Sequence, residues 1–118
     1  IRAGKTQDAI QQFDMALQTD PEWEDGLLAA GEAYLKMGMK QQEDARKIFN
    51  ESKKKDVVLD TTFKATVRKS VQYLQSYTAK NPNNPGAWTN LGTGFVLVDG
   101  NDKRGKVAYE KADALYKK

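Results

Sequence analysis

The feature that most constrains this chain is an internal repeat. Pro21 stands 61 positions before Pro82. Further pairs at this offset keep their side-chain size or backbone role: Gly31 and Gly92, Tyr34 and Phe95, Ala9 and Ser70, Phe13 and Leu74. Matches of this kind at one offset indicate that a structural unit occurs more than once, as in proteins built from stacked repeats. The 118 residues suffice for a short array of such units.

A shorter pattern of small and large residues lies inside this repeat. A small residue is followed four positions later by a large apolar one, and three positions after that by a third residue that is usually small. The instances are Ala9-Phe13-Ala16, Ala45-Phe49-Ser52, Ser70-Leu74-Tyr77 (with Tyr77 a bulky exception) and Gly105-Tyr109-Ala112. Spacings of three and four place all three residues on one helical face. The pattern therefore predicts helices that approach each other closely at the small residues.

Turn residues divide the chain into six expected helices. Pro21 ends the first, because a residue before proline avoids helical geometry, and Gly38 is expected to end the second. Asp60 is the expected N-cap of the fourth, and Asn84 with Pro85 begins the fifth. The expected spans are 5–19, 22–37, 41–53, 60–80, 85–98 and 102–117.

No segment is a convincing strand, so the predicted class is all-α. The nearest candidate is the β-branched run at 56–59. It is short and has no partner run, and we expect a connector or an abbreviated helix there.

Two sets of residues resemble a known family. Trp88, Leu91, Gly92 and Phe95 follow the spacing W-x2-L-G-x2-Y with Phe in place of Tyr, and Leu27, Ala30, Gly31 and Tyr34 give a weaker copy. Ala9, Phe13 and Ala16 follow A-x3-F-x2-A and precede Asp20-Pro21. These patterns resemble the two helices of the tetratricopeptide repeat (TPR), a helix–turn–helix unit of about 34 residues. The resemblance implies an α-α superhelix, a TPR-like solenoid of about six antiparallel helices with one repeat truncated.

The expected array spans residues 1–118 and is irregular. It contains a half repeat at 1–21, a repeat at 22–55, an abbreviated repeat at 56–84 and a repeat at 85–118. Each helix pair of such an array buries only part of its apolar face, and the neighbouring pair buries the rest. The expected buried residues are Ile10, Phe13, Leu17, Leu27, Tyr34, Ile48, Phe49, Val67, Val71, Leu74, Trp88, Leu91, Phe95, Val107, Tyr109 and Leu115.

Composition excludes several functions. The chain has no cysteine and no histidine, which excludes disulfides, thiolate metal sites and histidine acid–base catalysis. No other cluster resembles a nucleophile with its base, so we expect no enzyme activity, metal or cofactor. The net charge is +3 and no aromatic residues interleave the basic runs, which argues against nucleic acid. The longest clear apolar run, 95–98, is too short to span a membrane.

The family resemblance implies a binding surface. TPR proteins bind peptides or helices of partner proteins along a concave face lined by the first helix of each repeat. By the resemblance, the lining residues here would be Asp25, Leu28, Glu32, Lys36, Thr89, Asn90, Thr93 and Val96. Asn90 occupies a position where many peptide-binding members have an asparagine, whose amide can donate to and accept from a peptide backbone. The alternative is that these residues form ordinary surface.

Other hypotheses remain open from the sequence alone. The helix expected at 5–19 lacks a preceding partner helix, so its apolar face could mediate end-to-end self-association into a larger structural assembly. The basic runs at 53–55 and 103–106 could bind an acidic partner, although solvated helix ends explain them as well. The segment 99–102 superficially resembles a calcium loop, but Lys103 and Gly105 occupy ligand positions, and a simple turn explains it better.

Overall fold

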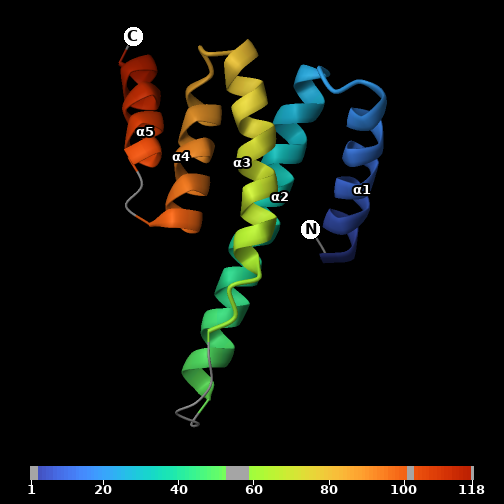
Figure 1. The fold of residues 1–118 in the computed structure, drawn as a ribbon, viewed down its shortest axis with the longest axis vertical. Coiled ribbons are helices and arrows are strands. Elements are labelled where there is room, and N and C mark those ends of the chain that lie inside the picture. Colours follow the sequence, from blue (N-terminus) through green and yellow to red (C-terminus); the bar gives the residue numbers. More distant parts are fainter. Residues whose placement is uncertain (1–2, 53–58, 101–102, 118) are drawn as a thin grey trace.

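The structure, a computed structural model, describes residues 3–52, 59–100 and 103–117. Within these ranges five helices follow one another: α1 (Ala3–Thr19), α2 (Glu24–Glu51), α3 (Phe63–Lys80), α4 (Pro85–Asp99) and α5 (Lys103–Tyr116). Each packs against the next in sequence, so the helices alternate in direction across the molecule (Figure 1). The described residues include no strand, which confirms the all-α class, while the expected number of helices was wrong by one.

Local sequence sets the helix ends that were predicted correctly. The side chain of Asn84 accepts a hydrogen bond from the Ala87 amide at 3.2 Å, and Pro85 occupies the first turn of α4. Gly100 follows α4 with a φ of 69°, a left-handed conformation that side chains other than glycine rarely adopt. The α1 helix ends at Thr19, ahead of Pro21 as expected.

The α3 helix begins two residues later than expected, with Thr62 and not Asp60 at the N-cap position. Asp60 does not cap the helix. Its carboxylate instead accepts hydrogen bonds from the Thr62 amide at 2.8 Å and from the Thr62 hydroxyl at 2.5 Å. These two bonds form a turn that leads the chain into Phe63, the first helical residue. They also hold the pKa of the exposed Asp60 carboxyl below its usual value.

Gly38 lies within α2 and does not end it. The next residues, Met39 to Glu43, are good helix formers, and Lys40 forms an ion pair with Asp44 at 3.1 Å one turn later. At Gly38 the helix crosses α3 so closely that a Cβ would lie 2.4 Å from Cγ2 of Val67. The glycine therefore allows close helix packing, which offsets its cost of about 1 kcal/mol in a helix interior. The two helices expected at 22–37 and 41–53 are one.

Two helix pairs pack in the same way. A Cβ on Gly31 of α2 would lie 2.7 Å from Cγ of Leu74 in α3. A Cβ on Gly92 of α4 would lie 2.9 Å from Cδ1 of Tyr109 in α5. In each pair a first-helix glycine therefore lies directly against a large side chain of the second helix. The residues that repeat in the sequence therefore also make equivalent packing contacts in the two helix pairs.

The small residues of the second helices take part in the same contacts. The Ser70 hydroxyl donates a hydrogen bond of 2.6 Å to the carbonyl of Gly31, and Ser70 is fully buried. In the other pair, a Cβ on Gly105 would lie 3.3 Å from the carbonyl oxygen of Gly92. A small residue at the position of Ser70 or Gly105 therefore lets the second helix of each pair approach the backbone of the first helix.

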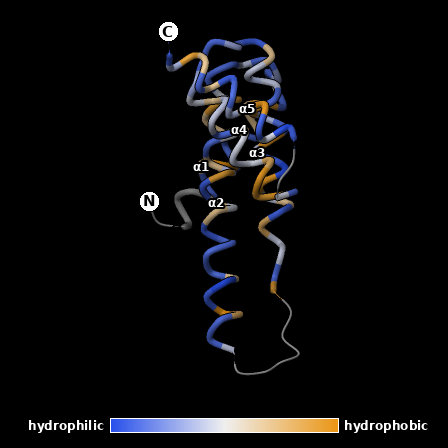
Figure 2. The backbone as a smooth tube through the Cα atoms, turned by 90° about the vertical axis from the view of Figure 1, so that its left-hand side faces the viewer, coloured by the Kyte–Doolittle hydropathy of each residue, from blue (hydrophilic) through white to orange (hydrophobic). Residues whose placement is uncertain are grey.

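The first half of α2 therefore packs against α3 as one helix pair, in the same way that α4 packs against α5. The prediction that residues 22–55 contain both helices of one repeat was wrong, because one helix spans Glu24–Glu51. Gly31 precedes Leu74 by 43 positions, whereas Gly92 precedes Tyr109 by 17. The additional residues form a projection, called here the arm, which consists of residues 39–51 of α2 and the described residues 59–62. Figures 1 and 2 show the arm extending beyond the ends of the other helices.

The core lies where α2, α3, α4 and α5 meet. Its largest cluster contains Leu35, Phe63, Val67, Val71, Leu74, Leu91, Phe95, Val98 and Ala108. A second cluster joins α1 to α2, α3 and α4 through Leu17, Leu27, Ala30, Tyr77 and Ala87. Of the residues expected to be buried, the structure buries Ile10, Leu17, Leu27, Tyr34, Val67, Val71, Leu74, Leu91 and Phe95. Those that are only partly buried are Phe13, Trp88, Tyr109 and Leu115.

Three of the expected core residues are exposed. Ile48 and Phe49 expose 67% and 42% of their surface, because they lie on the arm, beyond the reach of α4 and α5. Val107 exposes 48%, because it faces an open groove beside α5. The sequence pattern around Phe49 predicted a second helix of a repeat, and that prediction was wrong.

A shared carboxylate links α1 to the rest of the bundle. Asp14 accepts hydrogen bonds from the hydroxyl of Tyr34 in α2 at 2.5 Å and from that of Tyr73 in α3 at 2.6 Å. The two tyrosine rings lie 5.8 Å apart, centroid to centroid. Burial, together with the hydrogen bond to Asp14, raises the pKa of Tyr73 to about 12 and that of Tyr34 further.

We expect Tyr34 and Tyr73 to ionise at a higher pH than the tyrosines of an unfolded chain. Both folded-state pKa values lie above the value of about 10 for an unfolded chain. Their contribution to stability is therefore fully present below pH about 10 and is lost as pH rises through the folded-state values. Tyrosinate absorbance during an alkaline titration, with circular dichroism to follow unfolding, measures the pH at which these two tyrosines ionise. An Asp14→Asn variant should shift the late ionisations to lower pH, and an unchanged titration would contradict the role of Asp14.

Candidate interaction groove

An open groove crosses the face formed by α1, α2 and α4. Its volume is about 1150 Å³. The lining side chains come mainly from one stripe of α2, with two from α1 and one from α4: Ala9, Phe13, Ala29, Glu32, Ala33, Leu35, Lys36, Met39, Lys40, Gln42, Glu43 and Asn90. The stripe is continuous because α2 is unbroken at Gly38.

The groove combines an apolar floor with charges of both signs. Phe13 of α1 is half-buried, and Met39 of α2 exposes 47% of its surface. Between them Ala29 and Ala33 present only methyl groups, so an incoming backbone can approach α2 closely. Charged side chains follow one another along the stripe in the order Glu32, Lys36, Lys40 and Glu43. Such a surface suits an amphipathic segment that has both acidic and basic residues.

The structure brings together three of the eight residues that the resemblance implied. Glu32, Lys36 and Asn90 all line the groove, although Asn90 lies on α4 and the other two on α2. Their proximity depends on the contact between α2 and α4, which are far apart in sequence. Asn90 is partly exposed, so its amide is accessible from the groove.

The other five residues lie elsewhere on the same helices. Asp25 is exposed in the first turn of α2, where a carboxylate favours the positive end of the helix dipole. Leu28 is half-buried between the two core clusters. Val96 is 40% exposed and lies against Gly105 of α5.

Two threonines of α4 bond to protein groups. The hydroxyl of Thr89 donates to the carbonyl of Pro85 at 3.0 Å, and that of Thr93 donates to the carbonyl of Thr89 at 3.1 Å. The Thr93 hydroxyl also lies 2.9 Å from the Tyr109 hydroxyl. Thr93 therefore contributes to packing between α4 and α5.

Sequence reasoning missed the groove residues that follow Gly38. Because the sequence predicts a helix end at Gly38, the predicted lining residues on this helix stop at Lys36. In an unbroken helix the same face continues at spacings of three and four to Lys40 and Glu43. Phe13 was assigned to the core, and its contact with the groove depends on how α1 packs against α2.

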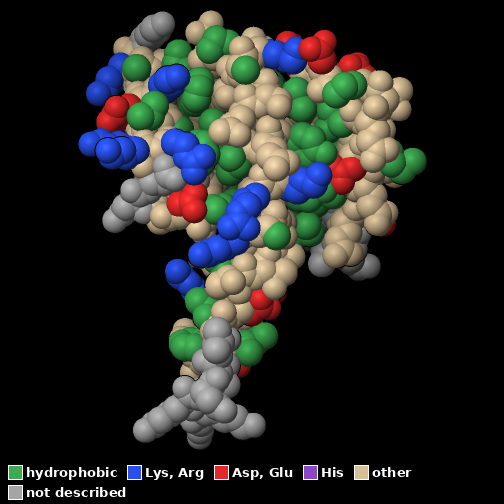
Figure 3. All heavy atoms as spheres, in the orientation of Figure 1, with side chains coloured by type: hydrophobic (Ala, Val, Ile, Leu, Met, Phe, Trp, Pro, Cys, Tyr) green, Lys and Arg blue, Asp and Glu red, His purple; other side chains and the backbone are tan. Residues whose placement is uncertain are grey.

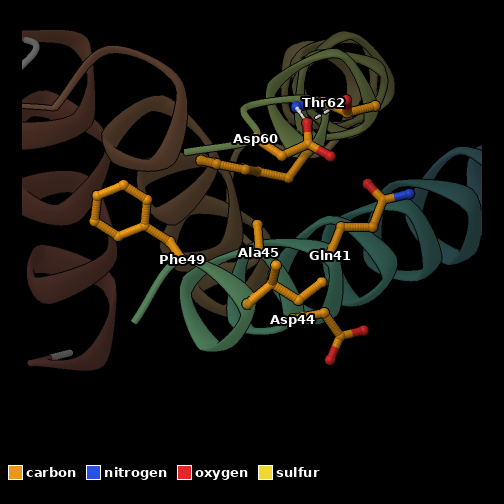
Figure 4. A pocket seen from close by; sticks show the side chains of 8 residues that line it. Gln41, Asp44, Ala45, Phe49, Asp60 and Thr62 are labelled. Carbon is orange, nitrogen blue, oxygen red and sulfur yellow. Dashed lines mark hydrogen bonds between the residues drawn. The ribbon is translucent and has the colours of Figure 1, made fainter. Parts of the chain in front are cut away.

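A smaller cavity lies within the arm, between the last turns of α2 and the segment that leads into α3 (Figure 4). Its volume is about 350 Å³. Gln41 and Ala45 of α2 lie on one side, and Asp60 and Thr62, joined by their hydrogen bonds, lie on the other. The side-chain oxygen of Gln41 is buried without a hydrogen-bond partner. Both hydrogen bonds that hold Asp60 on its side of the cavity come from Thr62.

The remaining predictions concern charge clusters and membranes. Lys53, Lys54 and Lys55 lie outside the described residues, whereas Arg104 is placed and forms an ion pair with Asp99 at 3.0 Å. In the part of the chain that the structure describes, no group of acidic side chains could hold a metal ion. Within the same ranges, none of the helices combines the length and the hydropathy needed to cross a bilayer.

Comparison with known proteins found no family model, no curated protein and no solved structure that matches this chain.

Proposed function

We propose that this chain is an interaction module of the tetratricopeptide type, which binds a peptide or helix of a partner protein in the groove formed by α1, α2 and α4. The main support is the groove itself, in which Glu32, Lys36 and Asn90 meet around an apolar floor. The repeated glycine contacts at Gly31 and Gly92 support the family assignment, because these residues occupy the glycine position of the pattern.

The arrangement suits binding of a partner segment. A helix could place its apolar side chains against Phe13 and Met39, where the floor is exposed. Its charged residues would then lie beside Glu32, Lys36 and Lys40, which fixes orientation and register more than affinity. Asn90 could donate to and accept from a peptide group at the α4 side.

A displayed peptide library selected on the wild-type chain tests this proposal. We expect the selected peptides to bind in solution and to shift the backbone amide signals of α1 and α2 around the groove. A Glu32→Lys/Lys36→Glu exchange keeps the net charge and should weaken binding roughly tenfold, because it reverses the charge order that the peptide meets. Asn90→Ala should weaken it as well, and Asn83→Ala, exposed in the α3–α4 turn, is the matched control.

Two outcomes would contradict this proposal. One is a set of selected peptides whose affinity is the same for the wild type, the charge exchange and Asn90→Ala. The other is concentration-dependent self-association in sedimentation experiments that Ala33→Arg abolishes. That result would show that the groove binds a second copy, as in the alternative hypothesis of a self-associating structural subunit.

A further inference from the structure

A second groove lies on the other side of α4. Its walls are α3 and α5, α4 forms its floor, and its volume is about 620 Å³. Trp88, Leu91 and Phe95 of α4 line it, whereas Asn90 of the same helix lines the first groove. Successive residues of a helix point about 100° apart, so these two sets lie on different faces of α4.

The floor of this second groove is apolar. Trp88 is half-buried, with its indole N–H donating to the carbonyl of Pro82 at 2.8 Å. Val107 of α5 exposes 48% of its surface beside it. Figure 3 shows hydrophobic side chains between α3 and α5 with Lys and Arg side chains beside them. An exposed apolar floor of this size can accept the large side chains of a ligand.

Among the residues that the structure describes, all the charged side chains that line this groove are basic. They are Lys103, Arg104 and Lys111, all from α5. Lys111 places its ammonium 4.4 Å from the ring centroid of Trp88, and the Arg104 guanidinium lies 4.6 Å from that of Phe95. Asp99, at the edge, forms an ion pair with Arg104. Two of the three cations, Arg104 and Lys111, therefore lie over aromatic rings of α4.

We propose that this second groove binds an acidic segment of a partner protein, with large apolar side chains interspersed among its carboxylates. The apolar side chains would cover Trp88 and Val107, which water now contacts. The carboxylates would meet Lys103 and Lys111, whose ammonium groups each have three hydrogen-bond donors. A basic segment would be repelled by the cations of the groove. A purely apolar segment would cover the floor but would bring no carboxylates to pair with the cations.

The charge distribution of the chain supports an acidic ligand. Residues 59–118 contain 10 Lys and Arg against 5 Asp and Glu, whereas the earlier residues are slightly acidic. A surface of one sign raises the rate at which a ligand of the opposite sign associates. This attraction is screened at high ionic strength, so binding should weaken with added salt.

Fluorescence of Trp88 provides the test. In a Trp23→Phe background Trp88 is the remaining tryptophan, and it lines the groove. The probe is a synthetic amphipathic peptide with leucines on one helical face and glutamates beside them. We expect this peptide to shift the Trp88 emission with saturation, and added salt to weaken its binding. The same peptide with lysines in place of glutamates should not bind.

Charge-reversal variants locate the binding surface. Lys103→Glu/Lys111→Glu should weaken the acidic peptide by roughly tenfold or more, because it replaces two attractions with two repulsions. Lys106→Glu/Lys117→Glu changes two exposed lysines of the same chain end that do not line the groove, and should weaken it much less. Circular dichroism confirms that both variants are folded, and the lysine-containing peptide and the salt series test the proposal without any charge variant.

Three results would overturn this inference. The first is the absence of a saturable change in Trp88 emission with the acidic peptide. The second is an equal loss of affinity in the two charge-reversal pairs, which would indicate only a general charge effect. The third is a response of Trp88 to anionic lipid vesicles but not to the acidic peptide, which would identify the groove as a membrane contact.

Discussion

Replacing Leu74 with alanine is expected to lower the free energy of unfolding by about 2–5 kcal/mol. Leu74 has no exposed surface and is among the largest side chains that are fully buried. It belongs to the main core cluster and lies directly against Gly31 of α2. Its truncation removes buried methyl groups and leaves a cavity, because Gly31 has no side chain that could fill the space. Chemical denaturation followed by circular dichroism measures the change.

Ile48→Ala is the matched control for Leu74→Ala. Both substitutions shorten a branched aliphatic residue in a helix, but Ile48 is 67% exposed on the arm. We expect a change within about 0.5 kcal/mol for Ile48→Ala, as for most surface substitutions. Equal effects at the two positions would mean that the arm is packed like the core, contrary to the structure.

Replacing Gly38 with leucine is expected to lower the free energy of unfolding by about 1–3 kcal/mol. On helix propensity alone, leucine in place of a helical glycine would stabilise by nearly 1 kcal/mol. The steric term is larger, because even a Cβ would lie 2.4 Å from Cγ2 of Val67, which is fully buried and has no room to move. The sign of the effect therefore separates a helical glycine that faces open space, where leucine would stabilise, from a glycine at a close helix crossing.

A double-mutant cycle with Val67→Ala tests the contact itself. Val67→Ala alone removes buried methyl groups and should be destabilising. In the double variant the shortened residue 67 leaves space for the side chain at 38, so the combined loss should be smaller than the sum of the two single losses. Strict additivity would show that residues 38 and 67 do not touch.

The sequence predicted the local elements well. The cap at Asn84, the turn at Gly100 and the end of α1 before Pro21 depend on backbone chemistry within a few residues, and these predictions were correct. The same holds for the apolar positions at helical spacing, such as Leu74 and Leu91, which are buried. Local hydrogen bonds and steric limits determine such features, so the neighbouring sequence is enough to predict them.

The sequence predicted less of the groove. Glu32 and Lys36 lie on one helix at a spacing of four, and sequence alone places them on a common face. Asn90 joins them only because α4 packs beside α2, and Phe13 only because α1 packs on the other side. The resemblance suggested Asn90, but neither the spacing nor the composition indicated which residues would lie opposite it.

What the sequence determined by itself is the class of fold and the internal repeat, since helical periodicity and paired glycines can be found without any structure. The tertiary structure alone decided the role of Gly38 and the partner of the first half of α2. A glycine that ends a helix and one at a helix crossing look the same in sequence. In the structure they differ in backbone conformation and in whether another helix lies within van der Waals distance. The second difference depends on residues such as Val67 that are distant along the chain.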